Sequence, residues 1–99
     1  MKMPRVLKSR SIRLNPKYFK CTVRGKPVTL TADQFRLLYC LMRQPGRVFT
    51  REEIIHATKG TDYPCTPKSV DVAIHHLRKA IGSEFIQAVR GMGYRYVFE

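Results

Sequence analysis

The chain of 99 residues contains no tryptophan, few acidic residues and no long apolar run. A helix that spans a bilayer needs roughly 18 consecutive apolar residues, and no stretch of the sequence approaches that length. The start of the chain also lacks the apolar segment of a secretion signal. We therefore expect a cytoplasmic protein that has no membrane partner.

Paired cysteines are missing too, because Cys21, Cys40 and Cys65 lie far apart and their number is odd. This pattern excludes a disulfide framework and the Cys-x-x-Cys pair that is typical of zinc sites. His75 and His76 are neighbours, but neighbours on a helix point about 100° apart and cannot chelate one ion together. We expect reduced, partly buried thiols, no metal and no cofactor.

Seven acidic residues stand against 19 lysines and arginines, which gives a formal net charge of +12. Such a surplus attracts polyanions, and nucleic acid is the obvious partner. Residues 1–30 hold nine of the basic residues and no acidic one, so the total charge does not locate a binding surface. We expect residues 1–10 to be a basic lead or linker remnant, which adds solubility or loose attraction to phosphates, before one domain over residues 11–99.

Short extended segments follow the basic lead. Turn residues separate them, and turn residues between short apolar runs are typical of antiparallel strands. The expected strands are Ser11–Leu14, Phe19–Val23 and Val28–Leu30.

Three helices are predicted after the strands, because capping residues mark the start of each one. A threonine followed three residues later by glutamine or glutamate forms a capping box, and a threonine before proline is also a typical start. The expected starts are Thr31, Thr50 and Thr66. Proline or glycine ends each helix. The expected ends are Gln44–Gly46, Gly60 and, after a third helix that runs to about Ile81, Gly82.

A hairpin is predicted at the end of the chain, with strands Phe85–Val89 and Tyr94–Phe98 around the turn Arg90–Gly93. The glycines of the turn permit positive φ. The complete order indicates an α+β fold, a winged helix-turn-helix with an N-terminal antiparallel sheet, three helices and a C-terminal β-hairpin wing.

The third helix carries the candidate binding face. Its apolar stripe must face a core, because residues at this spacing share one side of a helix. The stripe consists of Val70, Ile74, Leu77 and Ile81. The opposite side and its flanks carry Lys68, Ser69, Asp71, Val72, His75, His76, Arg78 and Lys79.

These side chains suit the major groove of duplex DNA. Lysine and arginine contact phosphates or guanine edges, which we expect of Lys68, Arg78 and Lys79, and His75 and His76 could donate to phosphates or bases. Val72 gains nothing from water but could pack on a thymine methyl group. Arg90, at the hairpin turn, is long enough to enter a narrow minor groove. We expect Asp71 to orient Arg78 or His75.

The sequence resembles the effector domain of OmpR/PhoB-type response regulators of two-component systems. The matching stretches are residues 28–38, 45–55, 69–72, 77–79 and 89–96. The resemblance implies a leading four-stranded sheet, with a strand near Val6–Lys8, and a short strand at Val48–Phe49 that pairs with the hairpin. It also implies transcriptional regulation through double-stranded DNA, with the third helix in the major groove and Arg90 at the minor groove.

Further partners are implied by the same resemblance. The loop between the second and third helices approaches RNA polymerase in some members, and such domains commonly lie head-to-tail on direct repeats. The corresponding loop residues are Lys59, Thr61, Asp62 and Tyr63. The sequence departs from the family at Ala73, where many members have a phosphate-binding histidine, so the preferred DNA sequence of a member cannot be carried over.

Two other classes of binding protein remain open. A basic RNA-binding or non-specific module would use exposed aromatic side chains for stacking, for which Tyr18, Phe19, Tyr94 and Tyr96 are the candidates. A protein-interaction winged helix would bind its partner with little dependence on salt. We expect no enzyme and no small-molecule substrate, because the sequence has no nucleophile-base set and no phosphate-binding glycine loop.

Overall fold

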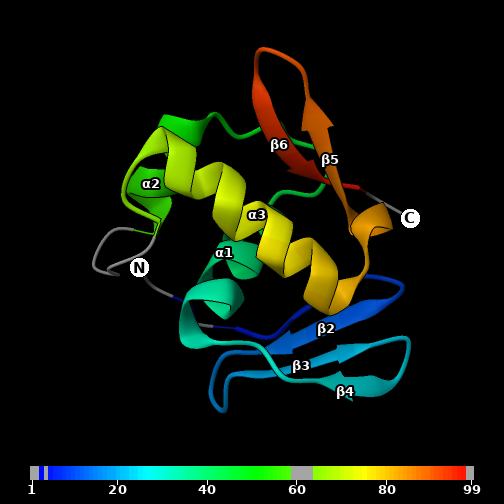
Figure 1. Cartoon of the computed structure of the whole chain (residues 1–99). Helices are drawn as coiled ribbons and strands as arrows, with labels where there is room; N and C mark the ends of the chain where they lie inside the picture. Colours follow the sequence, from blue (N-terminus) through cyan, green and yellow to red (C-terminus); the bar gives the residue numbers. More distant parts are fainter. Residues whose placement is uncertain (1–2, 4, 59–63, 98–99) are drawn as a thin grey trace.

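Residues 3, 5–58 and 64–97 are described by a computed structural model, in which a sheet, three helices and a hairpin follow one another (Figure 1). The sheet contains β1 (Leu7–Lys8), β2 (Ile12–Asn15), β3 (Lys20–Val23) and β4 (Lys26–Val28). The helices are α1 (Ala32–Met42), α2 (Arg51–Ala57) and α3 (Pro67–Ile81). The short helix η1 (Ser83–Phe85) precedes the hairpin of β5 (Ile86–Val89) and β6 (Gly93–Tyr96). The predicted winged helix-turn-helix fold is confirmed.

The N-terminal sheet is antiparallel in the order β1-β2-β3-β4. The strand implied near Val6–Lys8 is present as β1, so the basic lead of residues 1–10 contributes to the sheet. The prediction of a strand at Val28–Leu30 is wrong in its bounds, because Arg24 and Gly25 form the turn, with φ of 50° and 79°. Two positive φ angles are typical of a two-residue hairpin turn, so β4 starts at Lys26.

Each helix starts where the capping residues predict. Thr31, Thr50 and Thr66 all accept a hydrogen bond from the backbone amide three residues later. α2 ends at Ala57, and the hydroxyl of its C-cap residue Thr58 donates to the carbonyl oxygen of Ile54 at 2.8 Å. The predicted stop at Gly60 lies outside the described residues. None of the helices in the described part of the chain is long and apolar enough to cross a membrane.

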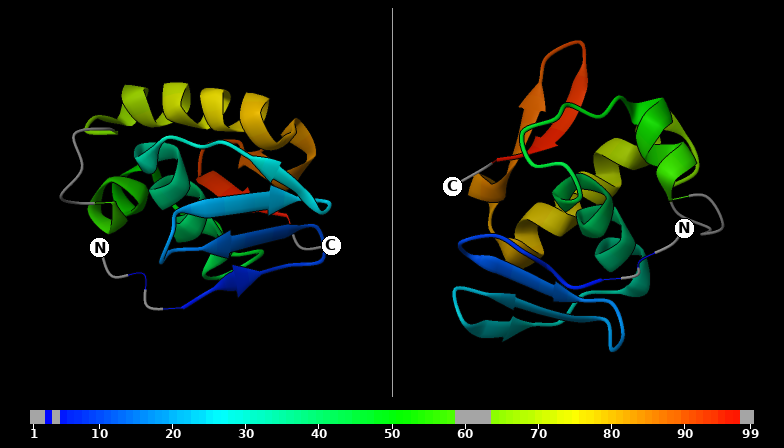
Figure 2. Two further views of the ribbon diagram at one scale, coloured as in Figure 1. Left: turned by 90° about the horizontal axis from the view of Figure 1, so that it is seen from below. Right: turned by 180° about the vertical axis from the view of Figure 1, so that it is seen from behind.

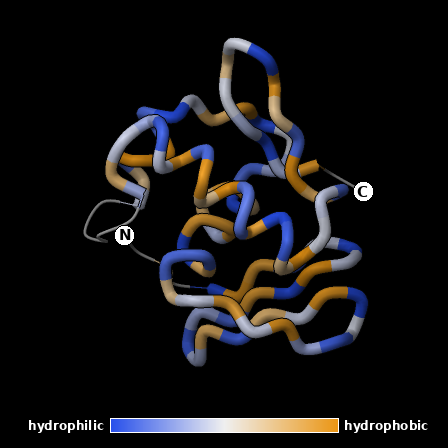
Figure 3. The backbone as a smooth tube through the Cα atoms, in the orientation of Figure 1, coloured by the Kyte–Doolittle hydropathy of each residue, from blue (hydrophilic) through white to orange (hydrophobic). Residues whose placement is uncertain are grey.

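The core forms between the inner face of the sheet, the three helices and the hairpin. All four members of the predicted stripe on α3 are at most 5% exposed, as expected for the side that faces inward. The largest fully buried side chains include Phe35 and Tyr39 of α1, together with Phe85 and Tyr96 near the C-terminus. Figure 3 shows apolar and polar residues alternating along α3, which has a buried and a solvent-facing side.

The C-terminal hairpin is attached to the loop before α2. Phe49 and Tyr94 exchange two backbone hydrogen bonds of 2.8 and 3.0 Å. The implied pairing with the hairpin is therefore present, but as a bridge at Phe49 alone and not as a strand over Val48–Phe49. The predicted strand Phe85–Val89 starts one residue later, because Phe85 ends η1. The other predicted strand, Tyr94–Phe98, is observed at Gly93–Tyr96, and Phe98 lies outside the described residues.

The three cysteines form no disulfide with one another, and two of them belong to the core. Cys21 and Cys40 are buried, and burial raises the pKa of each thiol to about 11. Both thiols are therefore protonated near neutral pH and pack as small apolar groups. Cys65 differs from the expected partial burial because it is exposed.

Candidate nucleic-acid interface

The solvent-facing side of α3 carries five of the predicted binding residues. Lys68, Val72, His75, His76 and Lys79 are all exposed, and we call this set the recognition face. Val72 is 42% exposed although it is apolar, and it lies among cationic and polar neighbours. An exposed methyl-bearing side chain on a polar helix face is suited to contact with a thymine methyl group. The recognition face thus combines positive charge and an exposed apolar side chain on one helix.

Two predicted binding residues on α3 have structural roles within the domain. Ser69 is half-buried, and its hydroxyl accepts hydrogen bonds from the backbone amides of Cys65 and Thr66 at 2.9 and 2.8 Å. Arg78 is half-buried too, and both Nε and Nη2 of its guanidinium donate to the carbonyl oxygen of Ile86. These bonds hold the start of α3 and join its end to the hairpin.

The wing presents Arg90 at its tip. Arg90 is exposed and begins the turn between β5 and β6, in which Gly91 has a φ of +74°. Met92, which the sequence analysis did not single out, is 59% exposed beside it. The tip of the wing therefore projects a cation and a flexible apolar side chain into solvent.

Asp71 connects α3 to both neighbouring elements. Its Oδ1 accepts hydrogen bonds from Nε of Arg51 at 2.8 Å and from the Tyr94 hydroxyl at 2.6 Å. The prediction that Asp71 orients Arg78 or His75 is therefore wrong. The sequence does not indicate Arg51 and Tyr94 as partners of Asp71, because they lie 20 and 23 residues away and no local spacing links them.

The electrostatics of this triad follow from its hydrogen bonds. The bond from Tyr94 is the largest influence that lowers the pKa of the Asp71 carboxyl, and the bonds and charge of Arg51 lower it further. Burial, followed by the bond to Asp71, raises the pKa of Tyr94. Asp71 is therefore ionised near neutral pH, and the triad holds α2, α3 and the wing in a fixed arrangement.

Replacing Asp71 with asparagine is expected to lower the free energy of unfolding near pH 7 by about 1 kcal/mol or less, because exposed ion pairs contribute little. A carboxyl whose pKa is lowered by folding stabilises the protein above its unfolded pKa of about 4, and this contribution is lost as the pH falls through the folded pKa. The difference between wild type and Asp71→Asn should therefore shrink at acid pH.

Urea unfolding at several pH values measures this difference. Asp33→Asn is the matched control, since Asp33 pairs with Arg36 at the longer distance of 3.7 Å on the surface of α1. An equal effect of the two substitutions at every pH would contradict a special role for Asp71.

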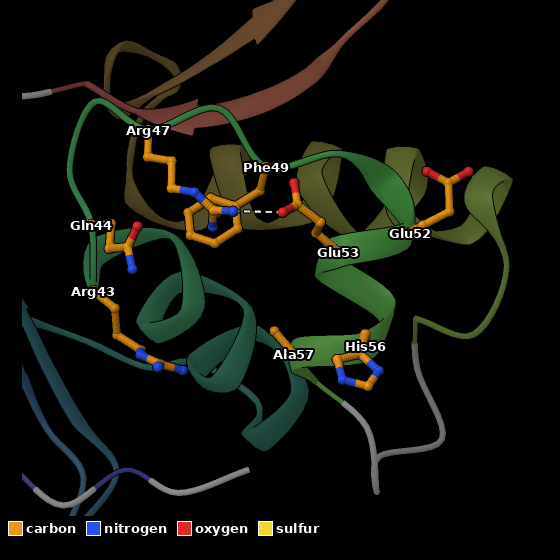
Figure 4. A pocket seen from close by; sticks show the side chains of 8 residues that line it. All are labelled: Arg43, Gln44, Arg47, Phe49, Glu52, Glu53, His56 and Ala57. Atoms are coloured by element: carbon orange, nitrogen blue, oxygen red, sulfur yellow. Dashed lines mark hydrogen bonds and ion pairs between the residues drawn. The ribbon is translucent and has the colours of Figure 1, made fainter.

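The loop before α2 is fixed by a second ion pair (Figure 4). The guanidinium of Arg47 lies 4.3 Å from the ring centroid of Phe49 and donates to the carboxylate of Glu53 on α2. A hollow of about 420 Å³ beside this pair is also lined by residues of α2 and of the end of α1. Arg47 thus secures the segment that pairs with the wing.

Metal-ligating residues do not gather in the described parts of the chain, where no group of three or more His, Cys, Asp or Glu could hold an ion. The rings of His75 and His76 are 5.9 Å apart and tilted by 49°. The loop residues Lys59, Thr61, Asp62 and Tyr63, implied to approach RNA polymerase, lie outside the described residues.

Comparison with known proteins agrees with this arrangement. The family model described as "Transcriptional regulatory protein, C terminal" matches residues 25–96, which include α1, α2, α3 and the wing. The chain belongs to this family. The predicted resemblance to OmpR/PhoB-type effector domains is confirmed.

Several relatives of this effector domain are response regulators. It is 40% identical over 88 residues, or 89% of the chain, to the transcriptional regulatory protein QseB of Escherichia coli O157:H7. It is 33% identical to the phosphate regulon transcriptional regulatory protein PhoB of Shigella flexneri, over 97% of the chain. The domain spans 40% of the length of QseB and 44% of that of PhoB.

Solved structures share its fold. The DNA-binding domain of RstA from Klebsiella pneumoniae, in complex with the RstA box, superposes with a TM-score of 0.81 and 27% identity. That match covers 93% of this effector domain and 96% of the RstA chain. The response regulator DrrB of Thermotoga maritima, an OmpR/PhoB homologue, gives a TM-score of 0.79 and 26% identity over 94% of this domain and 43% of the DrrB chain.

Proposed function

We propose that this domain binds double-stranded DNA in a sequence-specific manner, as the cytoplasmic output domain of a transcriptional response regulator. The observation that carries the proposal is the division of α3 into a buried apolar stripe and an exposed cationic recognition face that includes Val72. RstA, whose DNA-binding domain was solved with the RstA box, shares the fold. Catalysis is no part of the proposal.

In the proposed complex α3 lies in the major groove. Lys68 and Lys79 contact phosphates or guanine edges, His75 and His76 donate to phosphates or bases, and Val72 contacts a thymine methyl group. Ser69 and Arg78 act mainly through the positions of α3 and the wing, since their polar atoms already have partners inside the domain.

The wing lies over the adjacent minor groove in this proposal. Arg90 enters the groove, where the potential is most negative if the groove is narrow. We further propose that two copies bind head-to-tail on direct repeats, and that Lys59, Thr61, Asp62 and Tyr63 approach RNA polymerase. Both extensions rest on the family resemblance alone.

A stacking mode of RNA binding is disfavoured by the aromatic side chains. Tyr94 and Tyr96 are at most 8% exposed, and the ring of Phe19 stacks on that of Phe35 at 4.6 Å. Tyr18 is the one remaining candidate of the four, at 62% exposure. A single-strand platform needs successive stacked bases, and these side chains do not provide it.

Competition binding tests the proposal against both alternatives. A labelled duplex DNA should be displaced by unlabelled duplex DNA at lower concentration than by duplex RNA or single strands. The logarithm of its binding constant should fall linearly with the logarithm of the salt concentration, with a slope of about −0.9 for each phosphate neutralised. Preference for single strands would support the RNA-binding alternative, and binding of a protein partner with no dependence on salt would support the protein-interaction alternative.

Substitution of Val72 by alanine tests direct contact with a base. We expect discrimination at one base pair to fall by about 1 kcal/mol, because the apolar contact to a thymine methyl is removed. The measurement compares binding of wild type and variant to duplexes that differ by single base pairs. Equal weakening on every duplex, random ones included, would argue against contact with a base.

A further inference from the structure

Cationic side chains cover the outward face of the N-terminal sheet, away from α3. On β2, Ile12 and Leu14 point into the core, so Arg13 between them points outward. Lys8 is directly opposite Arg13 on β1, and Lys20 is opposite Asn15. Residues opposite each other in an antiparallel pair share a face of the sheet. Lys8, Arg13 and Lys20 therefore lie on one surface, which we call the outer sheet face.

More cations surround this face at the turns of the sheet. They are exposed and come from the same acid-free part of the sequence. They are Arg10 and Lys17. Arg24 and Lys26 belong to the other side of the sheet, because Arg24 pairs with Glu84 at 3.0 Å and Lys26 is opposite Val23, which points into the core. The ion pairs found among the described residues engage none of the five remaining cations. The positive charge of the outer sheet face is thus left uncompensated by neighbouring carboxylates in the described structure.

The placement of Lys8 beside Arg13 works against the stability of the sheet. Like charges directly opposite each other on neighbouring strands are destabilising. A bound anion would remove this repulsion. DNA held by the wing would not supply that anion, since in Figure 1 the wing and the sheet lie at opposite ends of the molecule.

The outer sheet face also has a different direction from the recognition face. Figure 1 looks onto α3, whereas the left view of Figure 2, turned by 90°, looks onto the strands of the sheet. Because the two surfaces face different ways, we expect a straight duplex held along α3 to leave the outer sheet face open to a second polyanion.

The chemistry of the face favours duplex nucleic acid over an acidic protein. Protein interfaces depend on buried apolar and aromatic anchors, whereas interfaces with DNA are polar and strongly positive. The exposed large apolar side chains near the sheet are Tyr18, in the turn after β2, and Val6, which precedes β1. Neither lies between Lys8, Arg13 and Lys20.

We propose that the outer sheet face is a second, sequence-independent binding surface for the phosphates of duplex DNA. Phosphate contacts by lysine and arginine carry no sequence information, so this surface holds any duplex. One domain can then hold two duplex segments, one along α3 and one across the sheet. This bridging goes beyond the proposed recognition function, and it depends on residues of the sheet that do not belong to the recognition face.

A two-duplex capture experiment tests the proposal. One random-sequence duplex is immobilised, protein is added at low salt, and capture of a second, fluorescent random duplex is measured. The wild type should capture the second duplex. The triple variant Lys8→Gln, Arg13→Gln, Lys20→Gln should bind the immobilised duplex but capture little of the second. Its salt slope for the second duplex should fall by up to about 2.7, or 0.9 for each of the three phosphates that it no longer neutralises.

The control variant removes the same charge elsewhere. The double variant Arg36→Gln, Arg43→Glu also removes three units of positive charge, and both residues lie on or next to α1, outside the sheet, α3 and the wing. It should therefore capture the second duplex as the wild type does. Equally weak capture by the sheet variant and this control would assign capture to net charge and overturn the proposal. Undiminished capture by the sheet variant would mean that two copies bridge through α3, which also overturns it.

Further outcomes distinguish the bridging proposal from the recognition function and from binding of an acidic protein. If the wild type binds the immobilised duplex but captures no second one, the bridging proposal fails while the recognition function stands. If the wild type binds neither duplex, both fail. If the sheet variant still captures duplex but no longer binds poly-L-glutamate, the face belongs to an acidic protein and the proposal is overturned.

Discussion

Replacing Gly93 with alanine is expected to lower the free energy of unfolding by roughly 3 kcal/mol or more, because it forces two backbone segments apart. A Cβ on Gly93 would lie 1.9 Å from the carbonyl oxygen of Phe49 and 2.8 Å from its carbonyl carbon. The φ of Gly93 is +150°, a region that is essentially limited to glycine. The substitution should therefore break the pairing between Phe49 and Tyr94 and release the wing.

Gly91→Ala is the matched control in the same hairpin. Gly91 also has a positive φ, +74°, but a Cβ there would meet nothing within 4 Å. Its cost should be limited to about 1–2 kcal/mol from the left-handed backbone. Urea unfolding followed by circular dichroism measures both variants, and hydrogen exchange at the Phe49 and Tyr94 amides reports the pairing. A cost for Gly93→Ala no larger than that for Gly91→Ala would contradict the close packing of the wing on the loop.

Neutralising the recognition face and the wing together should have the largest effect on DNA binding. We expect Lys68→Gln, Lys79→Gln and Arg90→Gln in one chain to weaken binding on the order of 100-fold. Each charge-assisted hydrogen bond to a phosphate is worth about 1 kcal/mol or more, and about 1.4 kcal/mol is a factor of ten. The dependence of affinity on log salt should also become shallower by about 0.9 for each phosphate that the variant no longer neutralises.

Fluorescence anisotropy with a short duplex at several salt concentrations measures this effect. The charge-matched variant Arg36→Gln, Arg43→Glu serves again as control, since neither residue lies on α3 or the wing or belongs to the ion pair that secures the loop before α2. If both variants bind equally weakly, the recognition face contributes only through net charge, and its assignment is wrong.

Most of the fold could be predicted from local patterns in the sequence. The capping threonines predict all three helix starts, and the spacing of Val70, Ile74, Leu77 and Ile81 predicts the buried side of α3. Such features depend on residues that are near in sequence, so the chain alone reveals them. The exposure of Val72 follows from the same periodicity.

Tertiary partners were beyond the reach of the sequence. Arg78 resembles any cation at the end of a helix, and only the fold shows its hydrogen bonds to the carbonyl of Ile86. Asp71 likewise has partners on α2 and β6 that no local pattern indicates. The predicted bounds of β4 were wrong because Gly25 and Pro27 together indicated a turn over Gly25–Pro27. The observed turn lies one residue earlier, at Arg24 and Gly25, which both have positive φ. Pro27 lies within β4, an edge strand, where proline is tolerated.

The most direct test of sequence-specific recognition by α3 is selection of bound sequences from a random duplex pool at physiological salt. The account predicts that the wild type enriches one motif, repeated in the same direction if two copies bind head-to-tail. Val72→Ala should relax a single position of that motif, at a thymine. If the wild type enriches no sequence, or if Val72→Ala enriches a motif identical to that of the wild type at every position, the account is contradicted.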